Sequence, residues 1–95
     1  MKKLFSVLTD DLEHCFITKS TEIAIHHVFG AANRKLSEHY GFILPLRPDW
    51  HNMSNYGVHF NREFDLQLKG MAQTYFEEHH GNRQAFIGIF GKSWL

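Results

Sequence analysis

Disulfides and membrane spans are the first features that this sequence excludes. The chain of 95 residues has one cysteine, Cys15, so it cannot form an internal disulfide or a zinc site built from several cysteines. Its apolar runs fall far short of the roughly 20 residues that a membrane helix needs. The start, Met1–Phe5, is basic and then apolar, but Asp10, Asp11 and Glu13 interrupt it before a signal-peptide core could form. We therefore expect a cytoplasmic protein with no membrane partner.

An excess of charge of either sign is also missing. Lysine and arginine number 10, aspartate and glutamate number 10, and the formal charge is +0 with the 8 histidines counted as neutral. No global basic field attracts DNA, so a nucleic-acid contact must come from a local basic cluster or a bound cation. The 43% of hydrophobic residues suffice for one modest core, and the length predicts a single domain over residues 1–95.

Three short apolar segments predict strands. Residues 15–17 and 22–26 flank a polar turn, and residues 42–46 form a third strand. Pro45 in this third segment favours an edge strand or the end of a strand.

Helix signals follow and alternate with these strands. Asn33 is expected to cap a brief helix that runs to His39 and stops at Gly41. Residues 47–60 are rich in Pro, Asn, Ser, Gly and His, which predicts a loop or a short irregular helix.

The strongest helix signal lies in the C-terminal third. Apolar residues recur at helical spacing over residues 64–79, with Asn61 as the expected N-cap and Gly81 as the expected stop. A shorter helix is expected over residues 82–90, ended by Gly91. Short strands combined with these helices predict an α+β fold.

Two adjacent imidazoles, His26 and His27, stand at the end of the second apolar segment. Neighbouring side chains of an extended chain point to opposite faces, so one imidazole can reach a metal while the other faces a substrate. Asn33, His51 and His59 follow. A metal-dependent nuclease needs such groups: a cation at the scissile phosphate, an imidazole that deprotonates water, and a group that orients this base.

The sequence around these residues carries a family resemblance. The motifs are HHVFGAANRK at 26–35, SE at 37–38, YG at 40–41, HNMS at 51–54 and GVHFN at 57–61. In these motifs the chain resembles small phage and prophage proteins of the HNH, or His-Me finger, nuclease class. It is similar to the phage recombination-enhancing nucleases that depend on the RecA recombinase. The resemblance covers most of the chain, from about Cys15 to the C-terminus.

The resemblance implies a ββα-metal core with the long helix packed over it and the short helix at the end. It implies that His27 is the general base, because the second histidine of the pair has this role in the class. Asn33 would orient the base or its loop. His26 would lie on the metal side, and His51 and His59 would be later metal ligands.

The same resemblance implies DNA as the substrate and a bacterial host cell as the location. Mg²⁺ or Mn²⁺ would be the catalytic ion, although a histidine-rich site also suits Zn²⁺ or Ni²⁺. Arg34, Lys35 and Lys92 would contact phosphates, and a recombinase or another host protein could be a partner. The oligomeric state stays open.

One departure concerns a second metal. Relatives often carry a structural zinc knuckle made of a Cys-x-x-Cys pair before the strand and a Cys/His pair after it. The matching positions here read Cys15, Thr18, Arg47 and Trp50, so three of the four ligands are missing. We do not expect a structural zinc, and packing by aromatic residues could replace it.

Alternatives of another class also fit the sequence. A repurposed, catalytically inactive HNH-like protein could bind a host or phage recombination, replication or defence factor, or it could bind DNA without cutting. The neutral charge and the aromatic content of 15% suit a protein interface at least as well as a DNA groove. The four remaining histidines, His14, His39, His79 and His80, are expected to be structural.

Overall fold

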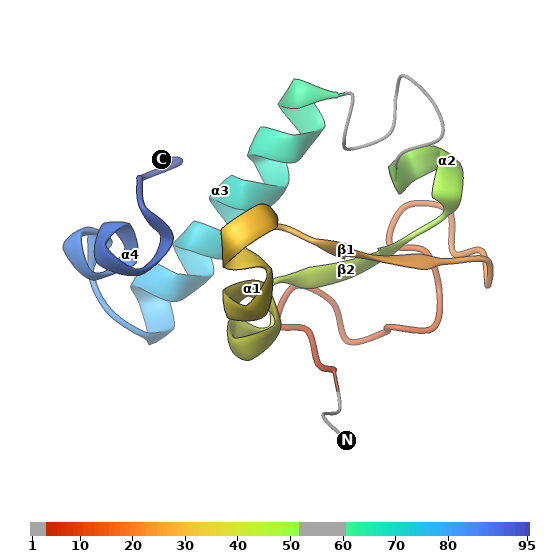
Figure 1. Ribbon diagram of the computed structural model, residues 1–95. Helices are drawn as coiled ribbons and strands as arrows, with labels where there is room; N and C mark the ends of the chain where they lie inside the picture. The colour runs from red at the N-terminus through yellow and green to blue at the C-terminus, as the bar shows by residue number, and fades with distance from the viewer. Residues whose placement is uncertain (1–3, 52–60) are drawn as a thin grey trace.

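Short strands and helices alternate in this chain, and Figure 1 shows their arrangement. The computed structural model describes residues 4–51 and 61–95. In chain order, the elements are β1 (Ala24–His27), the 3-10 turn η1 (Ala31–Asn33), α1 (Arg34–Tyr40), β2 (Ile43–Leu46), α2 (Pro48–His51), α3 (Arg62–His79) and α4 (Arg83–Phe90). The fold is α+β, as the sequence predicts.

The sheet sets the histidine pair opposite a buried strand. β1 and β2 are antiparallel, with His26 opposite Leu44 and His27 opposite Ile43. All of β2 is buried, Pro45 included. Proline cannot donate to a strand ladder, and it is tolerated here because each strand of a two-stranded sheet has one open edge.

Two of the three predicted strands are confirmed, and the third is wrong. The predictions at 42–46 and 22–26 correspond to β2 and β1, with β1 displaced toward the C-terminus so that both histidines lie on it. Residues 15–17 form a turn instead, in which the Lys19 N–H donates to the Cys15 carbonyl at 2.9 Å. A chain that reverses direction this soon leaves no extended segment for pairing.

The brief helix α1 is confirmed, but its predicted cap is wrong. It ends at Gly41, whose φ of 78° is left-handed. A Cβ at Gly41 would also lie 2.6 Å from the Phe5 ring, so the position requires glycine on two grounds. Asn33 occupies the N-cap position without making a capping bond. Its Nδ2 donates instead to the carbonyl oxygen of Phe90 at 3.0 Å, a tertiary contact that local propensity cannot reveal.

The two C-terminal helices begin as the sequence predicts. Asn61 Oδ1 accepts the Phe64 N–H at 3.1 Å at the start of α3, and Asn82 Oδ1 accepts the Ala85 N–H at 2.9 Å at the start of α4. Such caps contribute about 1 kcal/mol each. Gly91 ends α4 in the left-handed region with a φ of 100°.

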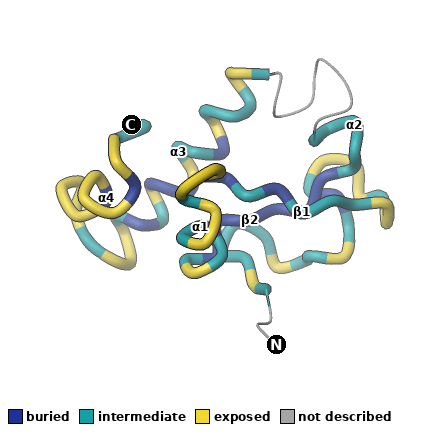
Figure 2. Tube along the Cα trace, viewed as in Figure 1, coloured by how far each residue is buried: buried dark blue, intermediate teal, exposed yellow. Residues whose placement is uncertain are grey.

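An aromatic core joins the sheet to α3 and α4. The rings of Phe86 and Phe90 stack with centroids 4.7 Å apart, and Phe29, at the exit of β1, lies 4.7 Å from Phe90. Phe76 of α3 packs edge-on against Phe86 at 5.3 Å. Figure 2 shows buried residues all along β2 and at separate positions of β1, α3 and α4. Burial of each such ring contributes about 1.5–3 kcal/mol, so these rings fix the C-terminal helices against the exit of β1.

The segment after β2 is helical in part. Residues 48–51 form the short helix α2, within the expected loop or irregular helix at 47–60; residues 52–60 lie outside the described part. Among residues 4–51 and 61–95, no helix is both long enough and apolar enough to cross a membrane.

Candidate functional site

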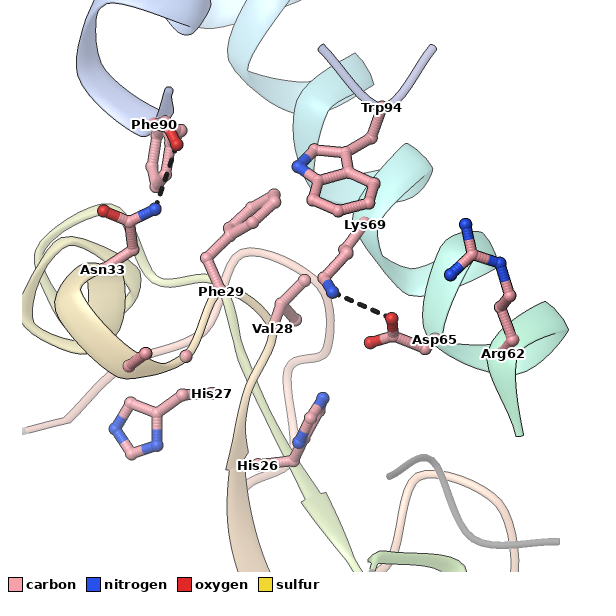
Figure 3. A pocket seen from close by; sticks show the side chains of 12 residues that line it. His26, His27, Val28, Phe29, Asn33, Arg62, Asp65, Lys69, Phe90 and Trp94 are labelled. Carbon is pink, nitrogen blue, oxygen red and sulfur yellow. Dashed lines mark hydrogen bonds and ion pairs between the residues drawn. The ribbon is translucent and has the colours of Figure 1, made fainter. Parts of the chain in front are cut away.

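The two histidines of the pair point to different sides of β1, as the strand periodicity predicts. His26 is 3% exposed. Figure 3 shows its ring on the side of α3, while the ring of His27 points away from α3. The side chain of His27 is 10% exposed. The pair therefore offers one buried imidazole and one partly exposed imidazole at neighbouring positions.

A carboxylate on α1 holds the ring of His27. Nε2 of His27 lies 2.7 Å from Oε2 of Glu38. An ionised carboxylate can only accept a hydrogen bond, so Nε2 carries the proton and donates a hydrogen bond to Glu38. In a neutral imidazole, Nδ1 then has the free lone pair. The contact fixes both the tautomer and the orientation of the ring.

Ser37, next to Glu38, fastens α1 to the exit of β1. Its Oγ donates to the Phe29 carbonyl at 2.7 Å and accepts the Phe29 N–H at 3.0 Å. Ser37 is fully buried, so losing either bond would leave a buried polar group unsatisfied. These two hydrogen bonds set the position from which Glu38 reaches His27.

An open cleft of about 630 Å³ lies beside the histidine pair. Its walls are the end of β1, the loop over residues 28–33, the first half of α3 and the C-terminal residues (Figure 3). The polar side chains and the tryptophan that line it are His26, His27, Asn33, Arg62, Asp65, Lys69 and Trp94. Three of the predicted site residues thus share one cleft, although they come from β1 and from the loop that follows it.

Asn33 lies in the cleft wall but does not contact His27 through a hydrogen bond. Its amide ties the loop to the C-terminal end of α4 through Phe90. The residue that orients the His27 ring is Glu38. The expectation that Asn33 orients the loop agrees with this geometry; direct orientation of the base does not.

His51, the last residue of α2, approaches the buried member of the pair. The His26 and His51 ring centroids are 5.4 Å apart, at an interplanar angle of 67°. Two imidazoles bound to one ion through nitrogens at about 2.1 Å place their centroids about 5 Å apart. The pair could therefore share an ion. His59 lies outside the described residues, and within them no group of three or more His, Cys, Asp or Glu side chains is placed to hold a metal.

The predicted phosphate contacts are spread over two regions. Arg34 and Lys35 are exposed on α1 and do not line the cleft. Lys92 lies near the cleft, because its Nζ is 4.3 Å from the ring centroid of Trp94. Lys69 approaches the same ring at 4.5 Å. Trp94 therefore collects two cations at one edge of the cleft.

Sequence reasoning missed the contribution of α3 to the cleft. Arg62, Asp65 and Lys69 line it, and their spacing of i, i+3 and i+7 puts them on one helical face. The sequence shows these polar residues beside the apolar stripe of the same helix, but nothing in it indicates that they face the histidines. Glu38 belongs to the SE motif at 37–38, but the sequence assigned it no role, because its contact with His27 depends on how α1 packs on β1.

Three of the positions that match the zinc knuckle, Cys15, Thr18 and Arg47, are close together, but only Cys15 is a residue type that binds zinc. The Cys15 Sγ accepts N–H groups from Thr18 at 3.3 Å and from Arg47 at 3.2 Å. Burial raises the pKa of the Cys15 thiol, but hydrogen bonding by the Thr18 side chain and by the backbone N–H groups of Thr18, Arg47 and Ile17 outweighs this effect and leaves the pKa below its usual value. Hydrogen bonds to the sulfur thus join the turn after Cys15 to Arg47, the residue after β2.

Comparison of the chain with protein-family models, with curated proteins and with solved structures finds no match.

Proposed function

We propose that this protein is a metal-dependent endonuclease of the HNH type, encoded by a phage or prophage, that hydrolyses DNA phosphodiester bonds in recombination or DNA processing. The observation that carries the proposal is the cleft beside β1. It is lined by an imidazole with a carboxylate-fixed tautomer, His27, and by a second, buried imidazole, His26, whose ring approaches that of His51. In the proposal, β1 and β2 belong to the ββα-metal core, and α3 is the long helix packed over it.

His27 is the general base of the proposed reaction. Nε2 is engaged by Glu38, so Nδ1 is the atom that takes a proton from the attacking water. Glu38 also stabilises the imidazolium that forms when the proton arrives, since its carboxylate lies 2.7 Å from the ring. This division makes His27 the catalytic residue and Glu38 a positioning residue.

His26 and His51 are the described residues that would hold the ion, and His59 is the further ligand that the resemblance implies. A bound Mg²⁺ or Mn²⁺ would stabilise the charge on the leaving oxygen of the phosphate. Zn²⁺ and Ni²⁺ suit imidazole ligands better, so the metal preference has to be measured. The spacing of the His26 and His51 rings fits ligands of a single ion.

Nicking of a supercoiled plasmid tests the proposal. Wild-type protein with Mg²⁺, Mn²⁺, Zn²⁺ or Ni²⁺ should convert the plasmid to the open circular form, and EDTA should stop it. His27→Ala should lower the rate by about 100-fold or more, the usual contribution of a general base. His39→Ala is the matched control, because His39 is an exposed histidine on α1 whose loss should leave the rate unchanged. Equal inactivity of wild type and His27→Ala with every ion would refute the nuclease.

The second candidate is a binding protein that keeps this scaffold without cutting. Large apolar side chains that are more than a third exposed favour it: Phe5, Ile17, Met71, Ile87, Ile89 and Leu95. Such side chains are common at protein interfaces. Retention of DNA at low salt without cleavage would favour a DNA-binding form, and a stable complex with a recombinase would favour a protein-binding form.

A further inference from the structure

The α3 wall of the cleft carries charges that nothing in the motifs assigns. Arg62, Asp65 and Lys69 all line the cleft on this side (Figure 3). Two cations against one carboxylate leave this wall with one positive charge in excess. The whole chain has a formal charge of +0, so the excess is a local property of the cleft.

The ammonium group of Lys69 is already paired within the protein. Its Nζ lies 2.8 Å from Oδ2 of Asp65, one turn earlier on the helix, and 4.5 Å from the ring centroid of Trp94. The Lys69 side chain is only 17% exposed. Lys69 and Asp65 therefore form a neutral pair that shapes the wall, and the excess charge is that of Arg62.

Arg62 is exposed, and its side chain has no hydrogen bond or ion pair with any other residue of 4–51 or 61–95. Two other guanidinium groups are paired: Arg47 with Asp49 at 2.6 Å, and Arg83 with Glu77 at 3.2 Å. The remaining one, Arg34, lies on α1 and outside the cleft lining. Among the described residues, Arg62 is the guanidinium that faces the cleft with its donors unused.

We infer that Arg62 binds a backbone phosphate of the nucleic acid strand that lies in the cleft. A guanidinium presents its N–H donors as a planar fork that matches two phosphate oxygens, and phosphates carry most of the contacts in protein–DNA complexes. The contact would hold the strand on the α3 side while His27 acts from β1. The inference rests on the proposed function, and it moves the main phosphate contact from Arg34 and Lys35 to α3.

The test measures DNA binding without cutting. A short fluorescein-labelled duplex is titrated in fluorescence anisotropy with His27→Ala protein and with the same protein carrying Arg62→Gln, Arg62→Lys or Arg34→Gln. Arg62→Gln should weaken binding by about tenfold and flatten the slope of log affinity against log salt by about one. Arg62→Lys keeps the charge but loses the fork, so it should restore the slope and only part of the affinity. Arg34→Gln is the matched exposed arginine, and it should bind like the parent.

The outcomes separate this inference from the proposed function. Parent-like affinity and slope for Arg62→Gln would overturn the inference, and nicking by the wild type would then leave the nuclease standing. A loss confined to Arg34→Gln would overturn it in favour of the α1 surface. Absence of DNA binding and of nicking by any form would overturn both. Thermal unfolding should be unchanged in Arg62→Gln, because Arg62 makes no bond that stabilises the fold.

Discussion

Oε2 of Glu38 and Nε2 of His27 lie 2.7 Å apart, so a residue of α1 fixes the imidazole at the end of β1. The bond joins residues 11 positions apart in the chain. It depends on Ser37, whose hydroxyl ties α1 to the backbone of Phe29. If His27 is the base, the rate of the reaction must depend on Glu38, a residue of the SE motif at 37–38 to which the sequence assigned no role.

Replacement of Glu38 therefore gives the first prediction. Glu38→Ala should lower the kcat of plasmid nicking by about 10- to 100-fold with little change in KM, as loss of an orienting partner does. Glu38→Gln should lose less, because the amide oxygen can still accept from Nε2. Glu78→Ala, an exposed glutamate on α3, is the control. An unchanged kcat in Glu38→Ala would show that the carboxylate does not position the base.

The second prediction concerns Asn33, which the structure uses as a tether. Its Nδ2 donates to the Phe90 carbonyl at 3.0 Å, so Asn33→Asp removes the donor with almost no change of shape. The free energy of unfolding should fall by about 1–3 kcal/mol, because the bond is lost and the new carboxylate oxygen faces the Phe90 carbonyl oxygen. Nicking should fall by less than the loss seen with Glu38→Ala, because Asn33 makes no hydrogen bond to His27. A larger loss of activity with unchanged stability would instead give Asn33 a direct role in the reaction.

The third prediction concerns the buried amide of Gln73. This side chain is 0% exposed; its Nε2 donates to Ser93 Oγ at 2.9 Å, and its Oε1 accepts the Trp94 N–H at 2.6 Å. Gln73→Ala should reduce the unfolding free energy by about 1–3 kcal/mol, because it removes these bonds and leaves a polar group unsatisfied. Gln67→Ala, an exposed glutamine on the same helix, should change it little.

Gln73 should also matter for the cleft. The residues that it holds include Trp94, which lines the cleft and contacts Lys69. We expect the Trp94 fluorescence of a Trp50→Phe background to shift toward that of an exposed indole in Gln73→Ala, and not in Gln67→Ala. An unchanged spectrum would show that the C-terminal residues stay in place without the amide.

The fourth prediction is a pH dependence centred on Cys15. The donors Thr18 and Arg47 leave the thiol pKa below its ordinary value of 9.0 despite the burial of the sulfur. An acidic group with a lowered pKa in the folded state adds stability above its unfolded pKa, and this contribution is lost as the pH falls through the folded pKa. The unfolding free energy of wild type relative to Cys15→Ala should therefore rise from neutral pH toward 9.0.

Urea denaturation under reducing conditions measures this difference. Cys15→Ala has no thiol to titrate, so its own pH dependence serves as the baseline. A difference that stays flat or falls with rising pH would mean that the N–H donors do not stabilise the thiolate. Iodoacetamide should modify Cys15 only as fast as the protein opens, because the residue is 0% exposed.

Much of the fold follows from local chemistry. Asn61 begins a helix with the cap that its side chain predicts, and Gly41 and Gly91 end helices because they lack a side chain. The strand predicted at residues 15–17 is wrong, because an apolar triplet has the same composition in a turn as in a strand. The turn is joined to a residue far along the chain by the Arg47 N–H, which donates to Cys15 Sγ.

The candidate site was predictable where it depends on local chemistry. The opposite directions of His26 and His27 follow from the strand itself, since neighbours on a strand alternate. The structure brings His51 near His26 and places Asn33 in the cleft wall, while the roles predicted for these residues stay predictions. Glu38 and Arg62 could not be found this way, because each reaches the site through the packing of a helix.

The sequence by itself determined the α+β class, the ends of the C-terminal helices and the placement of two imidazoles on opposite faces of one strand. These depend on spacing and on bonds between near neighbours, which a sequence records directly. Only the tertiary structure decided which nitrogen of His27 is left free and which arginine faces the cleft. Those outcomes depend on how α1 and α3 pack against β1, and packing is settled by the buried aromatic side chains of the whole chain rather than by any local pattern.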